Sequence, residues 1–368
     1  MKKGATFLIV STILFITGAA QDIIENRNAR LSVNADRVVT LKEEMRIEDT
    51  GEGFYFKNPR AIRVSPKGDV LIFDGQEQAL HFDAQGRFIR NLFKKGQGPG
   101  ELTVLFDIWA TSERLYLSGD PSKILVFHFD GTLDKEIILR GHAFGERFVR
   151  ADAGKITIRQ QAQIDPRGGS GFKDIRHDII EISINDSTAN VLGSFTVPGY
   201  VQVSEGGGLG IIGWNQLMAV PQDENTLIVN SSPDYLLVAF DTSKRAVSRK
   251  FRRPYERVKR TGGGGVRISG SASAPPAPEF QNDIYGVYVV DENVWVQTST
   301  VVEGKGILFD VFDGDGVYRD IFYLQGQWKN PSGKLINRTL TIAGGCVYSS
   351  ERSEDDLIVI KKCRLVGL

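Results

Sequence analysis

Apolar residues in this chain occur in short runs separated by turn residues, and no long segment repeats them with the 3.6-residue period of a helix. The clearest cycle contains four such runs, rich in Val, Ile, Leu and Phe, at residues 61–64, 70–73, 79–83 and 87–90. Turn residues, among them Ser65-Pro66-Lys67-Gly68-Asp69, separate the first two runs. This pattern predicts four antiparallel strands joined by hairpins.

The four-strand cycle returns along the chain. A Phe-Asp pair marks the third strand of each recognisable unit, at 82–83, 129–130, 240–241 and 312–313. A divergent unit fits between the second and third marks, at 156–197, and a last unit at 340–365 has three strands. The missing fourth strand is predicted at Arg37–Leu41, so that strands from both chain ends close a ring and leave no open sheet edge. We therefore expect an all-β fold, a six-bladed β-propeller of four-stranded antiparallel blades whose last blade is closed by an N-terminal strand.

Two segments resemble a known family. The pattern Ile-x-Val, Gly-Asp-Val-Leu-Ile and Phe-Asp-x-x-Gly-x-Phe-Ile of the first unit resembles an NHL-type repeat, and Lys94–Leu102 resembles the loop between blades in six-bladed β-propeller proteins common in Bacteroidetes and related bacteria. The resemblance covers residues 35–366 and is strongest over 57–140. Many members carry a lipoprotein cysteine that this chain lacks, so the resemblance does not imply lipid anchoring. The repeated Gly-His and Trp-Asp signature of WD40 propellers, the alternative architecture, is absent.

The first twenty residues have the features of a secretion signal. Lys2 and Lys3 precede an apolar run at 5–17, and Gly18-Ala19-Ala20 supplies the small residues of a cleavage site. The apolar run is short for a hydrocarbon core of roughly 30 Å, which disfavours the alternative of a retained anchor. We predict a signal peptide at 1–20 and a single propeller domain at 21–368, exported to the periplasm or beyond, monomeric and without a transmembrane segment.

The amino-acid composition says little about which partner the protein binds. Lys and Arg number 45 and Asp and Glu also number 45, so no global charge draws the chain to nucleic acid or anionic membrane, and a nucleic-acid partner is not expected. The 40 glycines indicate many tight turns. A Gly/Ser/Pro-rich stretch at 261–280 is expected to be a mobile loop.

The two ends of the predicted blades differ in loop length. Turns between first and second strands are short, at 65–69, 152–155, 223–225 and 291–293. Loops at the other end are long and irregular, at 93–103, 164–174, 198–215, 253–283 and 325–337. Because long loops on a rigid scaffold often carry function, the long-loop face is the expected binding face, with drift of surface loops as the alternative.

Counting back from the first turn of each blade nominates the residues at the channel mouth on that face. The candidate ligand-binding residues are Arg60, Asp107, Arg147, Gln216, Tyr285 and Arg338. Three arginines against one aspartate predict a positively charged mouth for a carboxylate, sulfate or phosphate. The alternative is that these arginines pair with loop acids such as Glu101 and Glu146 and tie the blades together.

A second basic feature lies at 244–260, where nine Lys or Arg residues face one acid, Glu256. It is either a groove for an anionic glycan, phosphate or protein partner, or an outer strand whose charges prevent edge pairing.

Signals for catalysis and metals are weak. His81 and His128 share a repeat position on third strands, away from the channel, so a zinc site is not expected. Asp107 is the best calcium candidate, as in gluconolactonase-like propellers, but lacks matched Glu and Asn partners, and no Gly-x-Ser-x-Gly elbow occurs. We expect no cofactor, with calcium left open. The expected function is non-catalytic binding of a small molecule, glycan or envelope protein, and the alternative is a metal-dependent hydrolase or lyase with its site at the channel mouth.

Two cysteines, Cys346 and Cys363, would enter an oxidising compartment. A turn near 352–356 places them on adjacent strands, so they form either a disulfide or two reduced core thiols, and the strand register decides between the two.

Overall fold

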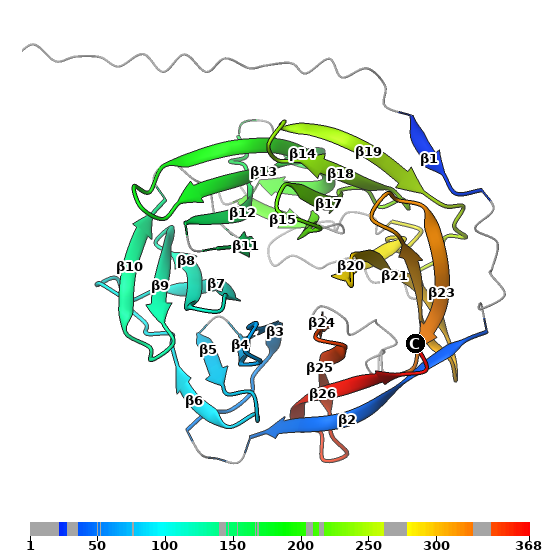
Figure 1. Ribbon diagram of the computed structural model, residues 1–368. Coiled ribbons are helices and arrows are strands. Elements are labelled where there is room, and N and C mark those ends of the chain that lie inside the picture. Colours follow the sequence, from blue (N-terminus) through cyan, green and yellow to red (C-terminus); the bar gives the residue numbers. More distant parts are fainter. Residues whose placement is uncertain are drawn as a thin grey trace, which may run out of the picture.

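Twenty-six β-strands form the described part of the chain and surround a central opening (Figure 1). The structure is a computed structural model that describes residues 22–27, 36–49, 51, 53–75, 77–139, 145, 147–152, 154–165, 167, 169–203, 209–212, 217–260, 278–326 and 340–368. The predicted signal peptide and most of the predicted mobile loop at 261–280 lie outside these residues. Within them, no helix has the length and hydrophobicity that a membrane crossing needs.

The strands group into six four-stranded antiparallel blades, which confirms the predicted fold. Blade 1 consists of β3 (Pro59–Val64), β4 (Val70–Asp74), β5 (Gln78–Phe82) and β6 (Phe88–Asn91), and blade 2 of β7 (Val104–Ala110), β8 (Arg114–Asp120), β9 (Lys123–His128) and β10 (Leu133–Ile138). Blade 3 consists of β11 (Arg147–Ala151), β12 (Lys155–Gln161), β13 (Gly171–Ser183) and β14 (Ala189–Val203), extended by β15 (Leu209–Ile212). Blade 4 consists of β16 (Met218–Pro221), β17 (Thr226–Asn230), β18 (Leu237–Asp241) and β19 (Ala246–Arg252), and blade 5 of β20 (Ile284–Val290), β21 (Asn293–Val302), β22 (Gly306–Phe312) and β23 (Tyr318–Leu324). Blade 6 combines β24 (Thr341–Ala343), β25 (Cys346–Arg352) and β26 (Ile358–Val366) with β2 (Val38–Glu48) from the other end of the chain.

The N-terminal strand closes the ring as predicted. From Thr40, opposite Val366, to Glu48, opposite Val359, β2 pairs antiparallel with β26. Its first two residues pair in parallel with β23 of blade 5, so that one strand joins two blades (Figure 1). Over the paired stretches, β2 covers the edges of β23 and β26, so a strand from another chain cannot pair with those edges.

The segment before β2 reaches one blade further. Strand β1 (Ile23–Glu25) pairs in parallel with β19 of blade 4. Asn26 follows it, and its amide donates to the backbone oxygens of Arg252 and Gly316 at 3.1 Å while its oxygen accepts from the amide of Tyr318 at 2.9 Å. This side chain therefore joins blade 4 to blade 5. Together, β1, Asn26 and β2 contact blades 4, 5 and 6.

Hairpin turns in the blades are specified by local hydrogen bonds. In the first turn, Ser65 Oγ accepts from the amides of Lys67 at 3.2 Å and Asp69 at 3.0 Å. Gly68 has φ of 94°, a conformation that side chains with a Cβ rarely adopt. Elsewhere, aspartates accept amide hydrogen bonds within their own turns, at Asp83, Asp130, Asp186, Asp241 and Asp313.

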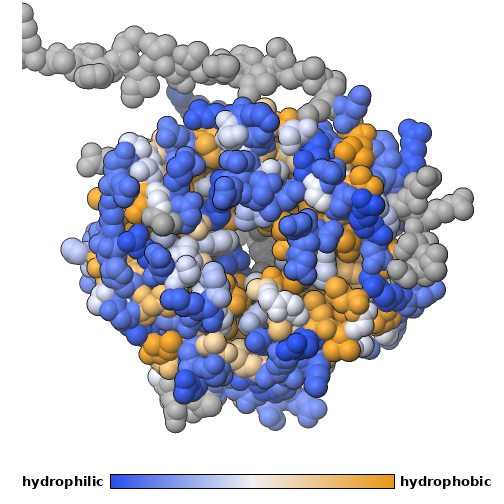
Figure 2. Space-filling view, in the orientation of Figure 1, coloured by the Kyte–Doolittle hydropathy of each residue, from blue (hydrophilic) through white to orange (hydrophobic). Residues whose placement is uncertain are grey.

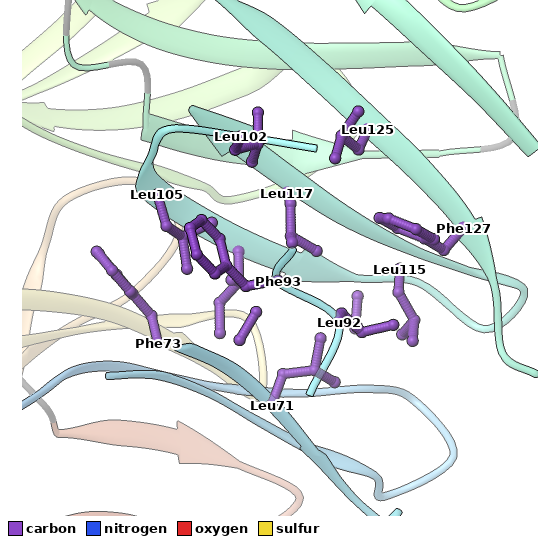
Figure 3. Packing of buried hydrophobic residues seen from close by; sticks show 13 residues of the cluster. Leu71, Phe73, Leu92, Phe93, Leu102, Leu105, Leu115, Leu117, Leu125 and Phe127 are labelled. Atoms are coloured by element: carbon purple, nitrogen blue, oxygen red, sulfur yellow. The ribbon is translucent and has the colours of Figure 1, made fainter. Parts of the chain in front are cut away.

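The core lies between neighbouring blades. Strand β4 is buried over all five residues because blade neighbours cover both of its faces. Between blades 1 and 2, Phe73 packs in a cluster with Leu105 and Leu117, and Phe93 and Leu102 from the connecting loop complete it (Figure 3). Burial of each such side chain contributes roughly 1.5–3 kcal/mol relative to exposure. The loop that resembles the family pattern is thus part of the packing between blades.

Two of the predicted long loops, 164–174 and 198–215, are partly strand. Strand β13 begins at Gly171 and β14 continues to Val203, so the two pair well past the rest of blade 3. Phe172 and Tyr200 face each other across this pair with ring centroids 5.3 Å apart. Such cross-strand aromatic contacts stabilise paired strands, and they explain why the segment is not irregular.

Candidate functional site

The first strand of every blade lies nearest the propeller axis, and Figure 1 shows β3, β7, β11, β20 and β24 around the opening. Figure 2 shows that the same view of the molecule is hollowed at its centre. Basic side chains come from only two of these six strands, β3 and β11, and the one acidic side chain is Asp107 on β7. Among the described innermost strands, the charged side chains therefore lie on blades 1 to 3.

Asp107 ties these three blades together. The side chain is buried, and its Oδ1 accepts from the amide of Ile108 at 2.9 Å. Its Oδ2 accepts from the amide of Phe148 on β11 at 3.0 Å and lies 3.5 Å from Nη2 of Arg63 on β3. This carboxylate is largely satisfied by the protein.

Arg63 lies against an aromatic ring as well as near the carboxylate. Its guanidinium carbon is 5.3 Å from the ring centroid of Trp109, and its Nε is buried without a hydrogen-bond partner in the structure. Cation–π contact of this kind holds a guanidinium in place while leaving its N–H groups available to a further acceptor.

Arg147 and Arg159 are directly opposite each other on the antiparallel strands β11 and β12. Like charges at such positions repel, so the pair destabilises the sheet unless an anion lies nearby. Arg147 is placed by the ring of Phe73 on blade 1, whose centroid is 5.7 Å from its guanidinium carbon. This contact joins blade 3 to blade 1.

Arg159 is the most perturbed cation of the group. Burial lowers the pKa of Arg159 to about 10, with further lowering by Arg147 and Arg63 and an opposing contribution from Asp107. Among the described residues its guanidinium has no hydrogen-bond or ion-pair partner. The charges of Arg147, Arg63 and Asp107 thus all act on Arg159. We call Arg63, Arg147 and Arg159 with Asp107 the channel arginine cluster.

His177 adjoins this cluster without adding charge to it. It lies on β13 opposite Gln161, two residues beyond Arg159 on β12. Burial and then the charge of Arg159 lower the pKa of His177 to about 4. At neutral pH the imidazole is therefore uncharged, and it is poorly suited to act as a general base or acid there.

The residues nominated from the sequence meet only in part. Asp107 and Arg147 lie in the channel arginine cluster. Arg60 is exposed near the start of β3, and Tyr285 lies on β20 in blade 5, where its hydroxyl donates to Gln281 Oε1 at 3.0 Å. Gln216 and Arg338 lie outside the described residues, as does His142. Glu101, proposed as a partner for the arginines, instead accepts from Gly98 within its own loop at 2.9 Å.

Two members of the cluster, Arg63 and Arg159, were not expected from the sequence. Their signal is a basic residue inside a strand that is otherwise apolar, in Ala61-Ile62-Arg63-Val64 and in Ile156-Thr157-Ile158-Arg159. In a strand enclosed by two neighbouring blades, such a charge is costly and therefore informative.

The basic segment at 244–260 is largely paired with nearby acids. These ion pairs are Lys244–Asp241, Arg252–Glu25, Arg253–Asp310, Arg257–Asp283 and Lys259–Glu279. Arg253 is the most enclosed, 2.9 Å from the fully buried Asp310, which also accepts from the hydroxyl of Tyr235 at 2.7 Å. These contacts favour a structural role for the segment over the alternative of an open groove that binds an anionic ligand.

Cys346 and Cys363 are free, buried thiols in the structure. Cys363 pairs with Val347 across β25 and β26, and Cys346 pairs with Arg364. Directly opposite residues share one face of a sheet, so this one-residue offset puts the two sulfur atoms on opposite faces.

Metal-ligating side chains do not converge in the described part of the chain, where no group of three or more His, Cys, Asp or Glu residues could hold an ion. His81 and His128 lie on β5 and β9, the predicted third strands of their blades. The His81 side chain is buried, and its Nε2 lies 3.6 Å from Oδ1 of Asp69, whereas the His128 side chain is half exposed.

Comparison with known proteins supports the fold. The model of a family described as a 6-bladed beta-propeller matches residues 36–155. A crystal structure of a protein from Bacteroides fragilis named "putative exported protein" is similar with a TM-score of 0.52 at 13% identity, over 93% of this chain and 99% of that one. Sqt1 of Saccharomyces cerevisiae has a TM-score of 0.45 at 12% identity, over 84% and 83% of the two chains. The WD40 β-propeller domain of Doa1 has a TM-score of 0.44 at 10% identity, over 87% and 96%. No curated protein matches the sequence. The chain is thus similar to six-bladed β-propellers, and the described strands have that architecture.

Proposed function

We propose that this protein is an exported, non-catalytic β-propeller that binds an anionic ligand at the channel arginine cluster. The observation that carries the proposal is the charge balance there. Arg159 has no hydrogen-bond or ion-pair partner among the described residues, and nearby Asp107 already accepts two backbone hydrogen bonds and lies 3.5 Å from Arg63. A buried or half-buried guanidinium without an acceptor is costly, and a bound carboxylate, sulfate or phosphate would supply the missing acceptor.

The geometry suits an anion better than a catalytic reaction. Guanidinium groups present fixed pairs of N–H donors that match carboxylate and phosphate oxygens, and they stay protonated at neutral pH. The low-dielectric walls of a channel strengthen this attraction. The neutral imidazole of His177 adds no proton acceptor or donor tuned to neutral pH. Acidic sugars are one class of ligand with the required carboxylate.

Export is supported by two independent features. The pattern of Lys2, Lys3, the apolar run at 5–17 and Gly18-Ala19-Ala20 is typical of a signal peptide. The similar Bacteroides fragilis structure bears a name that refers to export. We propose that residues 21–368 form one propeller domain in the periplasm or outside the cell, and that it acts as a monomer without a metal.

Titration calorimetry with phosphate, sulfate and glucuronate tests the proposal on the wild type and on Arg159→Gln. Loss of one charge-assisted hydrogen bond should weaken binding of any anion that binds by about tenfold or more. Arg150→Gln is the matched control, because Arg150 also lies on β11 but already donates to Thr157 Oγ1 and to the backbone oxygen of Asp223. It should leave the affinity unchanged.

Three results would count against this site. They are failure of every anion to bind the wild type, equal losses in Arg159→Gln and Arg150→Gln, and one tightly bound calcium or zinc ion per purified chain. Arg60→Ala adds a separate test of the mouth, because Arg60 lies three residues before Arg63 on the same strand.

A further inference from the structure

The channel has two chemically different sides. The charged side consists of β3, β7 and β11 with Arg159 from β12. The other side consists of β16 (Met-Ala-Val-Pro), β20 (Ile-Tyr-Gly-Val-Tyr-Val-Val) and β24 (Thr-Ile-Ala), and none of these strands contains a charged residue. Cations therefore occupy one half of the ring of innermost strands and neutral side chains the other half.

Side chains on the neutral side are only half-buried. They include Met218 and Val220 on β16, Tyr285 and Val289 on β20, and Ile342 on β24. An innermost strand has neighbouring blades on its two faces and a sheet partner on one edge, so its remaining exposed surface opens on the channel or its mouths. Exposed apolar surface in such a concave place favours the binding of an apolar group.

The two sides meet at the same depth. Innermost strands of a propeller run in the same direction, and Arg147 is the first residue of β11 while Tyr285 is the second residue of β20. Arg159 is directly opposite Arg147. Arg147 and the half-buried Tyr285 therefore lie at the same end of their innermost strands.

We infer that the ligand is an amphiphilic organic anion, with a carboxylate or phosphate on the channel arginine cluster and an apolar or aromatic body against β16 and β20. This inference rests on the proposed function and narrows its ligand class. An inorganic anion would satisfy the arginines and leave the apolar side exposed to water. A long uniformly polar chain, such as a polyuronate, would place polar groups against that side.

Calorimetry with phenyl phosphate and inorganic phosphate separates the two halves of the site. Phenyl phosphate should bind the wild type about tenfold more tightly than inorganic phosphate does, because burial of one face of the phenyl ring adds binding free energy equal to about a factor of ten in affinity. Tyr285→Ala should reduce this advantage to about threefold or less without changing the affinity for inorganic phosphate. Tyr285→Phe, which keeps the ring and removes the hydroxyl, should retain the advantage. Arg159→Gln should weaken both ligands.

Each other outcome has a defined meaning. Equal affinities for the two phosphates would overturn the amphiphilic ligand and leave the anion site standing. Binding of benzyl alcohol as tightly as phenyl phosphate would show a merely apolar channel and overturn both. If neither phosphate binds, the anion site and this inference fall together. Equal loss of the advantage in Tyr285→Phe and Tyr285→Ala would exclude contact with the ring.

Discussion

Replacing Arg159 with Met should stabilise the protein while removing ligand binding. The side chains have similar length, and Met carries no charge into the half-buried position on β12. At present the guanidinium lies opposite Arg147 and has no acceptor among the described residues. Sites built for ligands often carry such unfavourable charge, and apolar replacements at them raise stability at the expense of function.

The magnitude follows from the pKa of Arg159, which falls from the ordinary value of an arginine to about 10. This difference corresponds to about 3 kcal/mol of unfavourable free energy for the charged form in the folded state. Water in the channel screens part of that cost, so we expect the free energy of unfolding to rise by about 1–2 kcal/mol. Both pKa values lie well above neutral pH, so the group is protonated in the folded and the unfolded chain. Arg159 itself therefore adds no pH dependence to the gain between pH 5 and 8. Below about pH 6.5 the gain should grow, because His177 binds a proton in the unfolded chain, and its lowered pKa in the folded wild type disfavours that proton.

Urea unfolding of the wild type and Arg159→Met measures this gain, with an unchanged dependence of the unfolding free energy on urea. Arg63→Met is the matched control and should have the opposite sign, losing about 1 kcal/mol, because it removes the ion pair with Asp107 and the contact with Trp109. A second measurement is the pKa of His177, which should rise towards its ordinary value once the charge of Arg159 is gone.

An Arg159→Met protein that is less stable than the wild type would refute the reasoning. It would mean that the guanidinium has favourable partners and that the cluster is a structural tie. An unchanged pKa of His177 would likewise show that the two side chains do not interact.

Three other predictions concern the fold. Deleting residues 21–48 removes β1 and β2 and exposes the edges of β19, β23 and β26. Because β2 buries two apolar side chains, the deletion should lower the melting temperature by about 10 °C or more. An unchanged melting temperature in calorimetry would contradict ring closure. Thiol titration of denatured, unreduced protein should find both Cys346 and Cys363 reactive, whereas finding no free thiol would mean that the strand register is wrong. Hydrogen bonds from Ser183 and Thr188 lower the pKa of Asp186 to about 2, so this carboxylate stabilises the fold above about pH 4, and that contribution is lost as the pH falls towards 2. Urea unfolding at pH 7 and pH 3 should therefore show a smaller loss in Asp186→Asn than in the wild type, and equal losses would remove this turn from the acid response.

The fold was predictable because a propeller repeats its pattern. Each blade needs four apolar runs and three turns, so the missing strand of the last unit could be counted and then found near residue 38. Pairing of β2 with β23 as well as β26 was not predictable, since nothing in Val38 and Val39 distinguishes a neighbour in blade 5 from one in blade 6. The strand character of 198–203 was also hidden, because Pro198 and Gly199 read as turn residues.

The site was harder to predict because the innermost strands are irregular. Register shifts interrupt the pairing of β3 between Pro59 and Ala61, of β7 between Leu105 and Asp107, and of β11 at Phe148. A bulge moves the residues on its far side to the other face of the strand. Counting back a fixed number of residues from the first turn therefore does not reliably find the side chain that approaches the channel cluster. This is why the count selected Arg60, whereas Arg63 approaches Asp107.

The treatment of other buried cations in this chain strengthens the case for a ligand. Where Arg253 is enclosed between blades 4 and 5, the fold supplies the carboxylate of Asp310 at 2.9 Å and surrounds the guanidinium with tyrosine rings. The buried Lys123 likewise has Glu136 at 3.5 Å and the backbone oxygen of Gly98 at 3.0 Å. Arg159 has no such partner in the described part of the chain, although its pKa shows that the charge is costly there. Arg253 and Lys123 thus have acceptors from the protein itself and Arg159 does not, which is the contrast expected if Arg159 binds an anion from solution.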